Sequence, residues 1–256
     1  MKTLGTDAVA LRNRIEAHRR FSSRELEPWL LGLLRPRPGE RVLDLGCGTG
    51  KQSLPLARSV GPSGEVVGLD VSAAALAQAG EAVRAEGLAN LRFVEDRLED
   101  MDQALSPDAR FDAMLCSFAL YYSRDPEATL RAARARLVEG GRALVCGPAR
   151  DNNRAFVDLC ESVVPRGAQP ERIEASLGFM EDAGPRLFRR LFGCVEVHRF
   201  ENPLTFPQPE DVMAYWRSYH LHSPSHEAEL RRAVQARFAA HGAFTTVKVV
   251  LGALMR

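Results

Sequence analysis

The chain has 256 residues, of which 45% are hydrophobic and 26% charged, with a formal net charge of +1. This composition is typical of a soluble globular domain, and the near-zero charge excludes the strong positive field that draws proteins to nucleic acid or anionic membranes. The chain has five cysteines but no Cys-x-x-Cys pair, and it has neither a signal-peptide pattern nor an apolar run long enough to span a bilayer. We expect one cytoplasmic domain over residues 1–256 that carries reduced thiols, while its oligomeric state stays open.

Short apolar strands and helical patterns alternate through the first 150 residues. The expected elements are a helix after a capping box of Ser22 with Glu25, a strand over Arg41–Leu45, a helix from about Lys51, a strand over Val66–Asp70, a helix from Ser72 to about Gly87, strands over Leu91–Glu95 and Phe111–Ser117, a helix starting at Asp125–Pro126, and a strand over Arg142–Cys146. This alternation predicts a parallel sheet covered by helices on both faces.

The pattern changes after Pro148. Residues from about Asp151 to Leu191 have a helical pattern, and the remaining elements are a strand over Val195–Phe200, helices within 207–221 and 225–238, and a strand over Phe244–Leu251. We therefore expect a Rossmann-like α/β fold with a mostly parallel seven-stranded sheet. Its core covers about 37–150 and 192–256. A helical lid, about 151–191 plus 207–240, is expected over the carboxyl edge of the sheet, where such folds bind ligands.

The stretch Val42–Gly50, "VLDLGCGTG", joins a strand to a glycine-rich loop. Its glycines are spaced by two, so they fit neither the dinucleotide fingerprint nor the P-loop pattern. Asp44 precedes the loop, and its charge disfavours a pyrophosphate and favours an ammonium group. The loop therefore indicates a nucleoside ligand with a cationic arm.

Five successive segments resemble the motifs of class I S-adenosylmethionine-dependent methyltransferases. They are "VLDLGCGTG", "VVGLDVS", "VEDRLED", "FDAMLCSFALYY" and "ARLVEGGRALV". The resemblance is strong over about Arg41–Cys146 and looser towards the C-terminus. It implies an enzyme with S-adenosylmethionine as cofactor.

The resemblance also implies roles for residues at the strand ends. Asp44 would hold the methionine ammonium, Asp70 the ribose hydroxyls and Asp96 the adenine amino group. The full expected cofactor set is Asp44, Gly46, Cys47, Gly48 and Gly50 in the first motif, Asp70 and Val71 in the second, Asp96 with the backbone of Arg97 or Leu98 in the third, and Ser117 beside the methyl group. Taken singly, Asp70 also fits a helix N-terminal acid and Asp96 a solvated loop charge.

The sequence indicates the residues that would contact the methyl acceptor less clearly than those of the cofactor site. The segment after the fourth strand lacks the Asp/Asn-Pro-Pro-Tyr motif of many nitrogen methyltransferases acting on nucleic acid or protein, which favours a small-molecule acceptor and no nucleic-acid partner. Tyr121, Tyr122 and His220 are the candidate catalytic residues, with His220 as the base where one is needed. Trp216, Tyr219 and His220 follow helical spacing, so they form either a buried stripe or a substrate contact.

Several alternatives stay open. Arg20 or Arg24 either pairs with the cofactor carboxylate or is simply exposed, and no residue set with metal-ligand spacing is found. The favoured function is methyl transfer to oxygen, nitrogen or carbon of a small molecule in a biosynthetic pathway. The competing functions are another reaction of the same cofactor, such as aminopropyl transfer or cyclisation, and a non-catalytic binding module.

Overall fold

A computed structural model describes residues 8–164, 176, 178–219 and 221–256. Its helices and strands are, in chain order, α1 (Ala8–Phe21), α2 (Leu26–Leu34), β1 (Arg41–Leu45), α3 (Ser53–Val60), β2 (Glu65–Asp70), α4 (Ala73–Glu86), β3 (Leu91–Glu95), α5 (Met101–Ala104), β4 (Phe111–Ser117), α6 (Pro126–Ala135), β5 (Leu137–Pro148), α7 (Arg154–Glu161), α9 (Ala183–Leu191), β6 (Val195–Phe206), α10 (Pro209–Arg217), α11 (Glu227–His241) and β7 (Phe244–Met255).

The chain divides into two compact units. The sheet unit comprises Leu26–Arg150, Ala175–Arg199 and Val250–Arg256, and the helical unit comprises Met1–Glu25, Asp151–Glu174 and Phe200–Val249. Strands β6 and β7 each contribute residues to both units. The expected division of one domain into a core and a lid stays a prediction.

The seven strands form one sheet in the order β3-β2-β1-β4-β5-β7-β6. The pairs β1–β2, β1–β4, β2–β3 and β4–β5 are parallel, and β7 runs antiparallel to β5. This confirms the predicted Rossmann-like, mostly parallel sheet. The order reverses beside β1, so the carboxyl ends of β1, β2 and β4 meet at the switch point where such sheets bind ligands.

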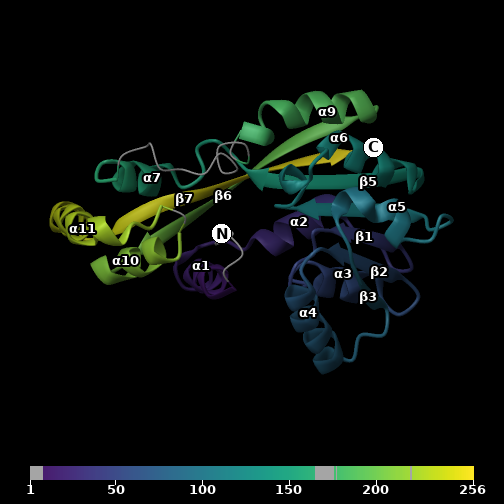
Figure 1. The fold of residues 1–256 in the computed structure, drawn as a ribbon, viewed down its shortest axis with the longest axis horizontal. Coiled ribbons are helices and arrows are strands. Elements are labelled where there is room, and N and C mark those ends of the chain that lie inside the picture. Colours follow the sequence, from purple (N-terminus) through teal and green to yellow (C-terminus); the bar gives the residue numbers. More distant parts are fainter. Residues whose placement is uncertain (1–7, 165–175, 177, 220) are drawn as a thin grey trace. The chain divides into compact units, whose positions relative to one another are not determined.

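Helices of the sheet unit bury both faces of the central strands. In Figure 1, α3 and α4 lie by β1–β3, and α9 lies beside α6. The apolar side chains of β1 are at most 1% exposed, as expected for a strand covered on both faces. The ends of α4 are as predicted, because the Ser72 hydroxyl accepts the N–H of Ala75 and Gly87 adopts a left-handed conformation with φ of 67°.

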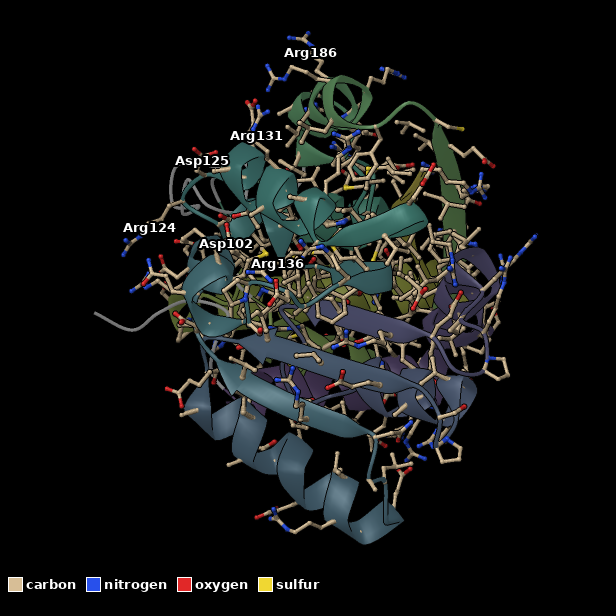
Figure 2. All side chains as sticks on the ribbon, turned by 90° about the vertical axis from the view of Figure 1, so that its right-hand side faces the viewer. Asp102, Arg124, Asp125, Arg131, Arg136 and Arg186 are labelled. Atoms are coloured by element: carbon tan, nitrogen blue, oxygen red, sulfur yellow. The ribbon has the colours of Figure 1, made fainter. Side chains whose placement is uncertain are left out.

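An ion pair fixes the end of α6 against α5. The side chain of Arg136 is 6% exposed, and it donates to Asp102 Oδ1 at 2.9 Å and to the carbonyl of Ser106 at 2.8 Å. Figure 2 shows Arg136 and Asp102 close together, whereas Arg131 and Arg186 project outwards from α6 and α9. At the other end of α6, Asp125 Oδ1 accepts the N–H of Ala128 and caps the helix as predicted.

Three sequence expectations differ from the structure. The capping box is wrong, because α2 begins at Leu26 while the Ser22 hydroxyl donates to the Arg24 carbonyl and Ser22 forms a β-bridge with Leu204. Helix α1 was not expected, since its sequence is rich in charged residues and has a low mean hydropathy. Strands β5, β6 and β7 each have 12 residues and are longer than predicted; the first part of β5 contains a register shift against β4, between the pairs Phe111–Leu137 and Ala113–Arg142.

The helical unit is organised around aromatic side chains. Phe156 of α7 contacts Tyr215 and Tyr219 edge-on, with ring centroids 4.9 Å and 5.2 Å apart, and Tyr215 also packs on Phe206 of β6. Trp216 is fully buried and donates its indole N–H to the Leu221 carbonyl at 3.0 Å. Trp216 therefore belongs to the buried stripe of α10, one of the two roles expected for it. Across the described residues, no helix combines the length and apolar character that spanning a bilayer requires.

Candidate cofactor site

The loop after β1 is tied to the end of β2 by its backbone. Gly46 and Cys47 both donate their N–H groups to the Leu69 carbonyl, at 2.7 Å and 3.2 Å, and Gly50 donates to the Cys47 carbonyl at 3.0 Å. This turn requires φ angles of 71°, 53° and 77° at Gly46, Gly48 and Gly50, a region that disfavours any residue with a Cβ. The backbone conformation of this turn therefore explains why glycine occupies all three alternating positions.

The three glycines differ in what surrounds them. A Cβ on Gly46 would lie 2.2 Å from the Cβ of Ala119, and one on Gly50 would lie 2.8 Å from Leu54. Two of the glycines thus allow close packing inside the sheet unit. In contrast, a Cβ on Gly48 would meet no atom within 4 Å. The backbone at Gly48 therefore borders open space, as expected where a ligand lies along the loop.

Asp70 connects the glycine loop to the next turn. Its Oδ2 accepts the Gly48 N–H at 2.8 Å, and its Oδ1 accepts the Ser72 N–H at 2.9 Å. Each carboxylate oxygen keeps a further lone pair, so the group still suits a vicinal diol. The structure thus gives Asp70 an organising role, and its predicted contact with ribose stays a prediction.

Asp44 lies deeper in the sheet than the other acids. It pairs with Gly68 on one side and Leu115 on the other, is 1% exposed, and accepts a 2.6 Å hydrogen bond at Oδ2 from the hydroxyl of Ser53. Burial raises the pKa of the Asp44 carboxyl to about 7; the Ser53 hydrogen bond opposes this shift, and the charge of Asp70 adds to it. Within the described chain, no hydrogen bond to Asp44 Oδ1 is found.

The residues expected around adenine follow β2 and β3. Val71 is 61% exposed, which is unusual for a large apolar side chain and fits one that a ligand covers. Asp96 turns its Oδ1 to the N–H of Arg97 at 2.8 Å, and its own N–H donates to the Asp70 carbonyl at 3.1 Å. Because the Arg97 N–H is engaged, the backbone of Leu98 is the better partner for a ring nitrogen.

Cys47, Cys116 and Cys146 are buried near the same strand ends, and burial raises the pKa of the first two well above that of an ordinary thiol. The Cys47 and Cys116 thiols are therefore protonated at neutral pH. Ser117, the expected neighbour of the methyl group, lies with its hydroxyl 3.2 Å from the Cys146 sulfur. The next residue, Phe118, has a φ of 57°, an outlier for a residue with a large side chain at this edge of the sheet.

Tyr121 and Tyr122 form the turn after β4. Their rings lie 4.6 Å apart, centroid to centroid, and the Tyr121 ring also contacts Phe179 at 6.1 Å. A Cβ on Gly147 would lie 3.0 Å from both Tyr121 and Met180, so the end of β5 is closely covered here. Burial raises the pKa of the Tyr121 hydroxyl well above its usual range. Tyr122 is 63% exposed beside it.

The remaining candidates belong to the helical unit. His220 lies outside the described residues, so its predicted role as a base stays a prediction. Arg24 donates to the Glu201 carbonyl at 3.0 Å and lies over the Phe200 ring, and Arg20 is 4.0 Å from Asp211, so both guanidinium groups have partners within their own unit. No three His, Cys, Asp or Glu side chains gather as a metal site in the part of the chain described.

Ser53, the partner of Asp44, was not predicted as a site residue. The available signal was a hydroxyl residue nine positions after Asp44, at the predicted start of the following helix. The contacts of Phe179 and Met180 with the Tyr121 region were not predicted either, because no local sequence pattern links these distant segments.

Comparisons with known proteins agree with this geometry. Residues 36–184 match the profile of a family described as methyltransferase domain. The 2-phytyl-1,4-naphtoquinone methyltransferase of Synechococcus elongatus is 38% identical over 152 residues, which are 55% of this chain and 64% of that protein. The ubiquinone/menaquinone biosynthesis C-methyltransferase UbiE of Vibrio campbellii is 36% identical over 110 residues, or 43% of this chain and 41% of that protein. The chain thus spans less than two thirds of the length of these relatives.

Structural similarity covers more of the chain. The crystal structure of a putative methyltransferase from Bacillus halodurans has a TM-score of 0.60 at 18% identity, covering 90% of this chain and 98% of that one. The fold, the glycine loop and the family match agree, and the chain belongs to the methyltransferase-domain family with the class I fold. The cofactor of this family is S-adenosylmethionine.

The residues of the sheet unit fit this cofactor. Gly48 borders open space, Val71 offers an exposed apolar surface, and the buried Asp44 carboxylate has an oxygen with no hydrogen bond from the described chain. These features suit a nucleoside with a cationic arm, whereas the negative charges of Asp44 and Asp70 would repel a diphosphate.

Proposed function

We propose that the protein transfers a methyl group from S-adenosylmethionine to oxygen, nitrogen or carbon of a small molecule, in a biosynthetic pathway. One observation supports the proposal most strongly. The carboxylates of Asp44 and Asp70 and the open backbone at Gly48 lie together where the order of the parallel strands reverses. The quinone methyltransferases among the relatives support a small aromatic acceptor.

In this proposal the chain binds and orients the cofactor. Asp44 holds the methionine ammonium, Asp70 the ribose hydroxyls, and Val71 one face of the adenine. Asp96 accepts from the adenine amino group, and the Leu98 backbone N–H donates to the ring. The cofactor supplies an activated methyl group, so the protein contributes alignment of the acceptor and exclusion of water.

Tyr121 and Tyr122 form the acceptor side, and Ser117 lies beside the methyl group of the cofactor. Tyr121 keeps its proton at neutral pH, since burial raises the pKa of its hydroxyl. It therefore serves as a hydrogen-bond donor or an apolar wall, and not as the base. A base is required only for an acceptor that is protonated at the working pH, and His220 is the residue proposed for it. Nucleic acid is not proposed as a substrate.

Methyl-labelled S-adenosylmethionine tests this function. The purified protein is incubated with the labelled cofactor and separate small molecules: a naphthohydroquinone with a free ring carbon, kept in its reduced form, a phenol, a carboxylic acid and an amine. Label in one acceptor together with an equal amount of S-adenosylhomocysteine supports the proposal. Conversion of an acceptor without label would instead indicate another reaction of the same cofactor. Binding without turnover of any acceptor would favour a binding module.

A further inference from the structure

The pair Asp44 and Ser53 is more than a packing feature of the loop. The two side chains are 1% and 0% exposed, and the hydroxyl donates to the carboxylate across a 2.6 Å distance. A buried carboxylate stays ionised only where hydrogen bonds or an opposite charge offset the lost hydration. Ser53 provides one hydrogen bond, to Oδ2, and Oδ1 receives none from the described chain.

In the part of the chain that the structure describes, no positive charge acts on Asp44 to complete this compensation. The loop contributes the thiol of Cys47, β4 contributes that of Cys116, and the end of β2 contributes the carboxylate of Asp70. Both thiols are neutral, and the second carboxylate repels the first. No basic side chain of the described residues acts on Asp44. A cation that comes to Oδ1 is therefore the missing partner.

We propose that Ser53 is a positioning residue that holds Asp44 for the cofactor's methionine ammonium, and that binding of this ammonium expels a proton from the Asp44 carboxyl to solvent. The inference rests on the proposed function, because the ammonium belongs to S-adenosylmethionine. In the free protein the carboxyl is largely protonated below neutral pH, since burial raises its pKa to about 7. Without the ammonium the proton stays on Asp44. When the ammonium is bound, it supplies the opposite charge that stabilises the ionised carboxylate.

The test measures proton release during binding of S-adenosylhomocysteine, which carries the same ammonium. Calorimetric titrations at each pH use two buffers of different ionisation enthalpy, so that the number of protons exchanged is obtained directly. For a group of pKa about 7, wild-type protein releases about 0.9 proton at pH 6, about 0.5 at pH 7 and about 0.1 at pH 8. The matched ligand 5′-methylthioadenosine lacks the ammonium arm, and its binding releases no proton.

Ser53→Ala removes the hydroxyl and shifts the carboxyl further towards its protonated form. For a shift of about one pH unit, affinity for S-adenosylhomocysteine falls about fivefold at pH 7 and only about twofold at pH 8. Affinity for 5′-methylthioadenosine stays unchanged. Ser59→Ala is the control, because Ser59 lies on the same helix and donates to the Pro55 carbonyl at 2.8 Å. Ser53→Cys, similar in size but a weak donor, serves where the alanine variant fails to fold.

The outcomes separate the two proposals. Binding of S-adenosylhomocysteine without proton release at pH 6 overturns the inference and leaves the proposed function intact. A Ser53→Ala defect that is the same at every pH, or equal for both ligands, shows a merely structural serine and also overturns it. Failure of the wild-type protein to bind S-adenosylhomocysteine at any pH contradicts the proposed function itself.

Discussion

Replacement of Asp44 by Asn is predicted to stabilise the free protein at high pH. In the folded state burial raises the pKa of Asp44 from 3.8 to about 7. Between these values the folded protein holds a proton that the unfolded chain has released, so stability falls as pH rises from about 4 to about 7 and is then constant. At about 1.4 kcal/mol per pH unit, this rise in the pKa of Asp44 lowers the free energy of unfolding by about 4 kcal/mol above pH 7.

Urea unfolding of the free protein at pH 6 and pH 8 measures this effect. From the same linkage, Asp44 lowers the free energy of unfolding of the wild-type protein by about 1.4 kcal/mol between the two pH values. The Asn variant keeps an acceptor for the Ser53 hydroxyl and carries no titrating proton, so it lacks this decrease. Other titrating groups are shared by both proteins and cancel in the difference. An equal pH dependence in the two proteins would refute the buried, proton-holding Asp44.

Three further predictions concern the same edge of the sheet. Gly46→Ala should lower the free energy of unfolding by about 3 kcal/mol or more, because its Cβ would lie 2.2 Å from the Cβ of Ala119. The control Gly61→Ala also has a positive φ, of 67°, but its Cβ would meet open space, so it should lower the free energy of unfolding by only about 1 kcal/mol. Equal losses of the two variants in urea unfolding would refute the close contact at Gly46. Asp70→Ala should weaken S-adenosylhomocysteine binding about 10- to 100-fold in calorimetry. It should also lower the free energy of unfolding by about 1–3 kcal/mol, because the Asp70 oxygens accept two backbone N–H groups. An unchanged affinity would show that Asp70 does not bind the ribose. Methyl transfer should continue in EDTA, because the described residues contain no cluster of metal-ligand side chains; a loss of activity that magnesium restores would contradict this prediction.

The sequence predicted the parts of the fold that local chemistry determines. The strand over Arg41–Leu45, the helix between Ser72 and Gly87, and the Asp125 cap follow from periodicity, caps and turn residues, and all three are confirmed. The loop glycines were also found, although their separate reasons, close packing at Gly46 and open space at Gly48, appear only in three dimensions.

The rest depends on contacts between distant segments. The bridge of Ser22 to Leu204 replaced a capping box whose residues looked correct, because tertiary pairing overrides a local preference. The burial of Asp44, and with it the raised pKa of its carboxyl, depends on the pairing of β1 with β2 and β4, while the hydroxyl of Ser53 opposes the rise. The sequence motif therefore predicts an acidic residue at position 44 but not the protonation state of its carboxyl.

A crystal structure of the protein with S-adenosylhomocysteine tests the central claim most directly. The account predicts the ribose hydroxyls within hydrogen-bond distance of Asp70, the adenine against Val71 with its ring nitrogen at Leu98, and the ammonium nitrogen within hydrogen-bond distance of Asp44 Oδ1, directly or through one water. A cofactor bound elsewhere, or bound along the glycine loop with its ammonium turned away from Asp44, would contradict it.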